Sequence, residues 1–242
     1  MSYRSGYAAL VGRPNVGKST LMNRLLGQKL AITSHKPQTT RHRILGIRSQ
    51  VDGQIVFVDT PGMHARGNKA MNFYLNRAAR SALQGEDIIL FVIQALAWTE
   101  EDELVLKAIT EAALPAIAVV NKVDLVPEKE KLLPFMQELA ERHEFLETVP
   151  VSAHDGDNLE VLAKAILDRL PAGEPIFPDD QISDRSERFF AAELLREQLT
   201  RRYHQELPYA LSVEIERFEE VGEQYRICLL YTSDAADDRP RV

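Results

Sequence analysis

The sequence predicts an α/β fold in which a mostly parallel six-stranded sheet is flanked by helices, followed by a smaller α+β region. Apolar runs of strand length alternate with segments of helical periodicity over the first ~170 of 242 residues, which is the pattern of an α/β sheet. The stretch 171–180 ends this alternation, because its three prolines within eight residues cannot continue a helix. We therefore expect a first domain over residues 1–172 and a linker over 173–182.

The strands of the first domain follow from its apolar runs, which we place at 7–11, 44–51, 55–58, 88–93, 116–120 and 148–151. The second run is followed by Asp52-Gly53, a hairpin dipeptide, so we expect the second and third strands to pair antiparallel. Helical periodicity fills the intervals at 19–26, 70–83, 101–112, 129–141 and 159–170.

The second domain is expected over residues 183–227. Ser183 or Asp184 would cap a helix that runs to about residue 203. Its apolar stripe is expected to consist of Phe190, Leu194, Leu195 and Leu199. Alternating apolar residues then predict two strands, at 211–215 and 225–229, with a turn at Gly222 between them.

Composition and charge narrow the class of protein. The chain is 45% hydrophobic and 27% charged, as in ordinary globular proteins, and its single cysteine excludes an intrachain disulfide. It contains neither a membrane-spanning apolar stretch nor the apolar core of a signal peptide, so we expect it in the cytoplasm. The net charge of −7 arises entirely after residue 170, where 16 acidic residues face 9 arginines. That region is a poor surface for phosphates.

A phosphate-binding loop is predicted at residues 12–19, whose sequence matches G-x-x-x-x-G-K-[ST] between a strand and a helix. Glycines let the backbone wrap a phosphate chain, while the lysine reaches the β- and γ-phosphates and the serine hydroxyl binds Mg²⁺. The candidate nucleotide-binding residues of this loop are Gly12, Arg13, Pro14, Asn15, Val16, Gly17, Lys18, Ser19 and Thr20.

A second motif, Asp59-Thr60-Pro61-Gly62, follows a buried strand. Here Asp59 would hold Mg²⁺ through water, and the Gly62 amide would meet the γ-phosphate. A threonine in the polar stretch 34–43 would complete the Mg²⁺ shell; Thr40 is our choice and Thr39 the alternative. We expect this stretch and residues 63–69 to act as order–disorder switches read by the nucleotide.

Base recognition is assigned to Asn121-Lys122-Val123-Asp124. The Asp124 carboxylate can accept hydrogen bonds from N1–H and the 2-amino group of guanine, two donors that adenine lacks. Asn121 would tie this loop to the phosphate loop, and the stem of Lys122 would cover the base. Backbone amides of Ser152-Ala153-His154 could meet the guanine O6. Two alternatives are a binding module with negligible turnover and an ATP-dependent enzyme such as a kinase; Asp124 argues against the second.

These motifs, in this order, resemble the translation-factor class of P-loop GTPases, and within it the Era family. The resemblance covers roughly residues 6–227 and is carried by stretches 12–23, 25–34, 37–44 and 59–64, together with 187–199, which is similar to the first helix of a KH domain. It implies a P-loop GTPase domain followed by a KH-like domain, with GTP or GDP and Mg²⁺ as ligands and hydrolysis assigned to Lys18, Thr40, Asp59, Gly62 and Asn15. It further implies association with 16S rRNA and the 30S subunit, with RNA and not DNA as the nucleic acid, and peripheral association with the inner membrane.

The sequence departs from the family pattern in two places, and one further residue differs from the pattern of many other GTPases. A KH domain of this kind needs a Gly-x-x-Gly loop, but Gly173 and Gly222 are the only glycines after residue 170. Residues 228–242 do not look like the family, so we expect a truncated KH domain with an anomalous tail. Met63 stands where many GTPases have a water-orienting glutamine, so we expect slow hydrolysis. Related GTPases with an asparagine at the position of Asn15 bind K⁺ there, which implies K⁺ as a further cofactor.

Overall fold

The computed structural model of the protein describes residues 2–33, 40, 42–62, 85–202, 211–222 and 224–233. The chain divides into two compact units, Met1–Ala31 with His35–Asp184, and Ile32–Ser34 with Arg185–Val242. The three residues 32–34 therefore belong to the second unit, although they lie far from the rest of it in sequence.

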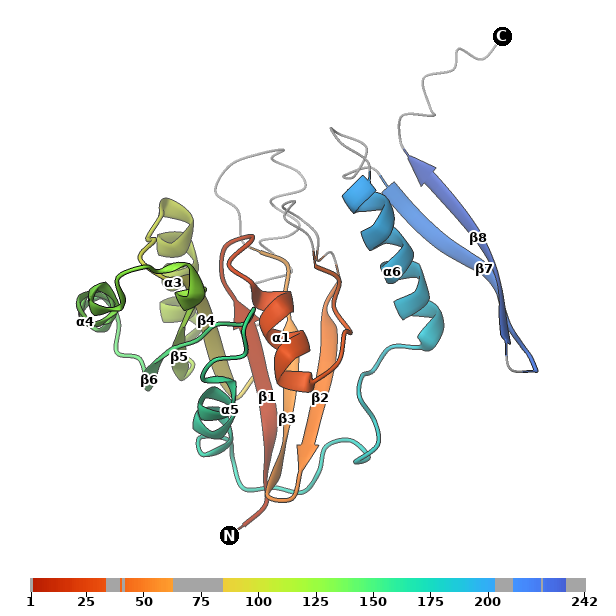
Figure 1. Ribbon diagram of the computed structural model, residues 1–242. Helices are drawn as coiled ribbons and strands as arrows, with labels where there is room; N and C mark the ends of the chain where they lie inside the picture. Colours follow the sequence, from red (N-terminus) through yellow and green to blue (C-terminus); the bar gives the residue numbers. More distant parts are fainter. Residues whose placement is uncertain are drawn as a thin grey trace. The chain divides into compact units, whose positions relative to one another are not determined.

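The first unit is built on a six-stranded sheet of order β2-β3-β1-β4-β5-β6 (Figure 1). β1 pairs parallel with β3 and β4, β5 pairs parallel with β4 and β6, and β2 pairs antiparallel with β3. The predicted fold class is thereby confirmed, including the antiparallel hairpin at Asp52-Gly53. The strands are β1 (Arg4–Val11), β2 (Ile44–Gln50), β3 (Gly53–Asp59), β4 (Ile88–Gln94), β5 (Ala116–Asn121) and β6 (Glu147–Pro150).

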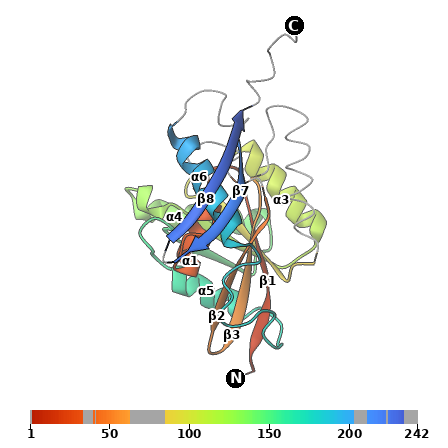
Figure 2. The same ribbon diagram turned by 90° about the vertical axis from the view of Figure 1, so that its right-hand side faces the viewer.

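Helices cover both faces of this sheet. α1 (Lys18–Leu26) and α5 (Leu159–Leu167) pack on one face against β1 and β3, and α3 (Glu100–Ala112) lies on the other side of the strands (Figure 2). On that second face, Phe91 and Val120 form a core with Val105 of α3 and with Leu139 of α4 (Leu132–Arg142). Two short 3₁₀ helices, η1 (Val123–Leu125) and η2 (Lys129–Lys131), precede α4. The helix predicted at 70–83 lies outside the described residues.

The stretch predicted as a linker is bonded to the first unit over much of its length. Its anchor is the fully buried side chain of Gln54 on β3, whose Oε1 accepts hydrogen bonds from Ile176 N (2.8 Å) and Phe177 N (2.9 Å). The Gln54 Nε2 donates to Phe177 O and to Ser49 Oγ, both at 2.9 Å. Phe177 also packs against the apolar cluster that contains Val56.

The two residues that follow this stretch, Ser183 and Asp184, do not cap the next helix as predicted. Ser183 Oγ donates to the Leu45 carbonyl at 2.6 Å, and Asp184 Oδ1 accepts from Leu45 N at 3.4 Å, so both side chains bind β2. The helix α6 begins later, at Glu187, where Ser186 O accepts from Phe189 N at 3.0 Å. The polar residues at 183 and 184 look like a cap in sequence, but their partners are carbonyl and amide groups of a distant strand.

Replacing Gln54 by alanine is expected to lower the free energy of unfolding by about 2–4 kcal/mol, because it removes a fully buried side chain and leaves the backbone N–H groups of residues 176 and 177 without their acceptor. Urea unfolding monitored by circular dichroism measures the change. Gln137→Ala, at an exposed position of α4, is the matched control and should change the value by no more than about 0.5 kcal/mol. Equal stabilities of the two variants would contradict the role given to Gln54.

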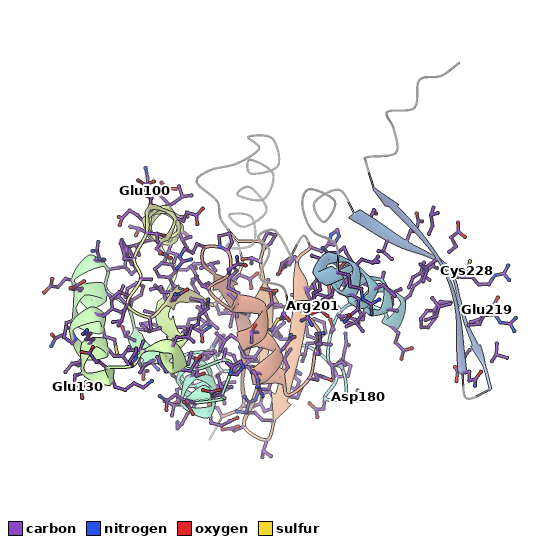
Figure 3. The ribbon with its side chains drawn as sticks, turned by 45° about the horizontal axis from the view of Figure 1, so that its top comes forward. Glu100, Glu130, Asp180, Arg201, Glu219 and Cys228 are labelled. Carbon is purple, nitrogen blue, oxygen red and sulfur yellow. The ribbon has the colours of Figure 1, made fainter. Side chains whose placement is uncertain are left out.

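The second unit contains α6 (Glu187–Arg202) and an antiparallel hairpin of β7 (Leu211–Val221) and β8 (Gln224–Ser233). Residues 228–233, predicted to start an anomalous tail, continue β8, and Cys228 lies on this strand (Figure 3). Ile215 on β7 is buried, with 2% exposure. No helix in the described part of the chain is long and apolar enough to span a membrane.

The buried side of α6 is polar, so the predicted apolar stripe is wrong. Leu194 is 41% exposed, whereas the residues of α6 that are buried are Glu193, Arg196, Glu197 and Thr200. Ion pairing makes this burial tolerable: both oxygens of Glu193 accept from Arg196, at 2.7 and 2.8 Å. Glu197 accepts from Thr33 N (3.0 Å) and from Arg201 (2.9 Å).

Candidate nucleotide-binding site

The phosphate loop lies where predicted, between the end of β1 and the start of α1. Gly17 precedes α1 with φ 102°, a left-handed conformation that favours glycine. Lys18 is buried, and its Nζ donates to the carbonyls of Gly12 and Arg13, both at 3.0 Å. Burial lowers the pKa of Lys18 to about 8, although the nearby Asp59 carboxylate acts in the opposite direction. Of the other loop residues, Val16 is buried, Pro14 and Thr20 are half-buried, and Asn15 is exposed with φ 62°.

Three oxygen-bearing side chains meet beside this lysine. Ser19 Oγ donates to Asp59 Oδ2 at 2.7 Å, and Thr40 Oγ1 lies 3.0 Å from Ser19 Oγ and 3.3 Å from Asp59 Oδ2. The alternative residue, Thr39, lies outside the described residues. Asp59 is fully buried, and this burial raises its pKa; its Oδ1 accepts no hydrogen bond within the described part of the chain. A buried carboxylate with an unused oxygen beside two hydroxyls is a donor set that suits Mg²⁺.

The turn after β3 brings its backbone against the phosphate loop. A Cβ on Gly62 would lie 2.9 Å from Pro14 N, so a side chain at this position would collide with the phosphate loop. The side chain of Thr60 anchors the turn: its buried Oγ1 donates to the Leu10 carbonyl at 2.8 Å and holds the turn to β1. Pro61 is buried, and Met63 lies outside the described residues.

Asn121 joins three of the predicted motifs. Its Nδ2 donates to Val16 O in the phosphate loop at 2.8 Å, and its Oδ1 accepts from Ala153 N at 3.0 Å. Ser152 Oγ in turn donates to Asp124 Oδ1 at 2.7 Å, and this bond fixes the orientation of the carboxylate. Val123 of the same motif donates its N–H to the Val151 carbonyl at 3.2 Å. The loops that would hold the phosphates and the base are therefore connected by direct hydrogen bonds.

Two residues of this site were not predicted. Gln94, at the carboxyl end of β4, accepts from Lys122 Nζ at 3.1 Å, and burial lowers the pKa of Lys122. Arg24 of α1 donates to the backbone carbonyl of His154, whose side chain points to solvent with 83% exposure and contacts Asp155. The sequence did contain a signal for Gln94, because it is the polar residue that interrupts an otherwise apolar run.

Comparison with known proteins identifies relatives that match most of the chain. A family model described as "50S ribosome-binding GTPase" matches residues 7–122. The chain is 53% identical over 219 residues to GTPase Era of Pseudomonas aeruginosa strain LESB58. The matched region covers 90% of this chain and 72% of the relative. It is 52% identical over 226 residues to GTPase Era of Azotobacter vinelandii, covering 93% of this chain and 75% of the relative.

Solved structures agree with these sequence matches. A variant of Aquifex aeolicus Era bound to GDP·AlF₄⁻ has a TM-score of 0.90 at 39% identity, covering 96% of this chain and 79% of that one. Era in complex with MgGDPNP and nucleotides 1506–1542 of 16S ribosomal RNA has a TM-score of 0.86 at 40% identity, covering 91% of this chain and 74% of that one. Because it is 53% identical to GTPase Era of Pseudomonas aeruginosa over 90% of its length, this chain belongs to the Era family of GTPases.

Proposed function

We propose that this chain is a GTP-binding and GTP-hydrolysing switch that acts in small ribosomal subunit assembly through 16S rRNA. The observation that carries the catalytic part is the convergence of Ser19, Thr40 and Asp59 beside the buried Lys18. The guanine part is carried by Asp124, which Ser152 orients. Relatives bound to GDP·AlF₄⁻ and to MgGDPNP support both assignments.

Each residue has a defined task in this proposal. Ser19 and Thr40 would bind Mg²⁺ directly and Asp59 through water, while Lys18 would leave the carbonyls of residues 12 and 13 to bind the phosphates. The bound cation would neutralise charge on the β- and γ-phosphates. The Gly62 amide would bind the γ-phosphate, which couples the turn after β3 to the state of the nucleotide.

Hydrolysis separates this proposal from a binding module without turnover. We expect slow GTP hydrolysis in the presence of Mg²⁺, several-fold faster in K⁺ than in Na⁺ at matched ionic strength, because Asn15 would help to hold a K⁺ ion beside the phosphates. Phosphate release measured with GTP and with ATP in both salts is the test. Equal rates in the two salts would remove Asn15 from the mechanism, and GTP binding without turnover would favour the binding module.

The partner is proposed from the relatives. Era has been solved in complex with nucleotides 1506–1542 of 16S ribosomal RNA, and this chain covers 74% of that protein. We extend the 16S rRNA and 30S association to this chain, with the cytoplasm as the compartment and the inner membrane face as a peripheral site. The second unit is the part similar to a KH domain, so it is the candidate RNA-binding part.

RNA binding by this chain is expected to be weak. No Gly-x-x-Gly sequence occurs after residue 170, and the net charge of −7 in that region repels phosphates. We expect affinity for a 16S 3′-end oligonucleotide at least 100-fold below that of the Pseudomonas aeruginosa relative, with GDP binding retained. A fluorescence anisotropy titration of both proteins at near-physiological salt measures this. Sub-micromolar, sequence-selective binding by this chain would contradict the prediction.

A further inference from the structure

An ion pair joins the phosphate loop to the start of α3. Its basic partner belongs to the loop, and its acidic partner lies outside the nucleotide-binding motifs. Arg13 Nε donates to Asp102 Oδ2 at 3.1 Å, across 89 positions of sequence. The Asp102 side chain is completely buried, and that of Arg13 is 15% exposed. A charge-assisted bond shielded from water in this way is stronger than a surface pair and does not tolerate the loss of one partner.

Asp102 also caps α3. Its Oδ2 accepts from Thr99 N (2.9 Å) and from Thr99 Oγ1 (2.8 Å), and Thr99 Oγ1 accepts from Asp102 N at 3.4 Å. The same carboxylate oxygen therefore serves both the helix cap and Arg13. The other oxygen, Oδ1, is buried and accepts no hydrogen bond from any described residue. A cap alone does not require a completely buried negative charge, so the position of Asp102 is explained better by its pairing with Arg13.

Arg13 lies in the part of the loop that binds Lys18. Its carbonyl accepts from Lys18 Nζ at 3.0 Å, and the next residue, Pro14, is the one that would collide with a side chain at Gly62. Fixing the Arg13 side chain on α3 therefore restricts the backbone that faces both the lysine and the turn after β3. A loop held in its binding conformation loses less conformational entropy when the phosphates bind.

We propose that Asp102 is a positioning residue for nucleotide binding, because it holds Arg13 and thereby keeps the phosphate loop in its binding conformation. Asp102 itself does not touch the nucleotide in this proposal. Because the tether acts on the loop in the ground state and in the transition state alike, its loss weakens binding and leaves the chemical step unchanged. The effect should be equal for GDP and GTP.

A double-mutant cycle tests the proposal on the full chain. Asp102→Asn keeps a side-chain oxygen that can accept a hydrogen bond from Thr99 N, but it removes the negative charge. Arg13→Gln removes the positive charge of the ion pair. We expect each single variant to bind GDP and GTP about tenfold more weakly, with the KM for GTP raised to the same extent and kcat within about twofold of the parent protein. The double variant should bind no more weakly than either single variant, because both substitutions break the same tether.

Two controls separate positioning from stability. Thr99→Ala removes the cap hydroxyl but leaves the Asp102–Arg13 pair, so it should lower the melting temperature while GDP affinity stays within about twofold. Glu160→Gln breaks a different ion pair of the first unit, 2.7 Å from Arg48, and should leave affinity unchanged. The proposal would be overturned if the losses of affinity in Asp102→Asn and Arg13→Gln multiply in the double variant. It would also be overturned if both single variants bind nucleotide as tightly as the parent protein. If Asp102→Asn does not fold, Arg13→Gln decides by its affinity and kcat, and GDP binding by the parent protein confirms the site independently.

Discussion

Asp124→Asn is expected to convert this guanine-binding protein into one that prefers xanthine nucleotides, with a loss of GDP affinity of about 1,000-fold or more. The structure explains why the amide would be oriented correctly. Ser152 Oγ donates to Asp124 Oδ1 at 2.7 Å, so in the variant this hydroxyl retains the amide oxygen as its acceptor. The amide NH₂ then faces the base, where it suits the 2-oxo group of xanthine and conflicts with the 2-amino group of guanine.

Competition titrations with GDP, XDP and ADP against a fluorescent nucleotide measure this change. Asp168→Asn, an exposed position in the i,i+4 pair with Lys164, is the matched control and should retain guanine preference. If Asp124→Asn still prefers GDP to XDP, or if ADP competes with GDP at the parent site, then Asp124 does not read the base.

Gly17→Ala is expected to lower the affinity for both GDP and GTP by about 100-fold, or roughly 2.7 kcal/mol. Two effects combine at this position. Gly17 has φ 102°, which an alanine adopts only with strain, and the added Cβ would lie 2.4 Å from Asn121 Nδ2. Asn121 would have to move, which breaks its 2.8 Å bond to the Val16 carbonyl and disconnects the base loop from the phosphate loop.

Gly27→Ala separates these two effects. Gly27 ends α1 with φ 70°, but a Cβ there would meet no atom within 4 Å. It should therefore reduce stability through strain and leave nucleotide affinity close to that of the parent protein. Isothermal titration calorimetry with GDP measures both variants. Equal losses of affinity in the two would show that general strain in α1, and not the collision with Asn121, is responsible.

Features encoded by short stretches of sequence could be predicted. The strands follow from apolar runs such as 88–93, and the phosphate loop follows from eight consecutive residues between a strand and a helix. The same holds for the antiparallel β2–β3 hairpin, because Asp52-Gly53 marks its turn. In each case the residues that cause the structure are neighbours in the chain, so periodicity and turn chemistry are sufficient.

Features that depend on partners far away in sequence could not be predicted. Ser183 resembles a helix cap until its 2.6 Å bond to the Leu45 carbonyl is known. The sequence of α6 predicts an apolar stripe, yet Glu197 is one of its buried residues, because Thr33 and Arg201 supply hydrogen bonds to its carboxylate. Asp102 reads only as an acidic residue in the first turn of α3. Its pairing with Arg13 spans 89 positions, and no local pattern encodes it.

The hydrogen bonds of Asn121 have a consequence for the order in which the protein acquires activity during synthesis. Asn121 lies 105 positions after its acceptor Val16 and 32 positions before its donor Ala153. Contacts of such long sequence separation close late, because a long loop of chain must be ordered first. A nascent chain that has emerged only as far as the phosphate loop and α1 holds the phosphate-binding residues but none of the groups that select the base. If these residues select the base as proposed, guanine-specific binding would begin only after residue 153 has left the ribosome.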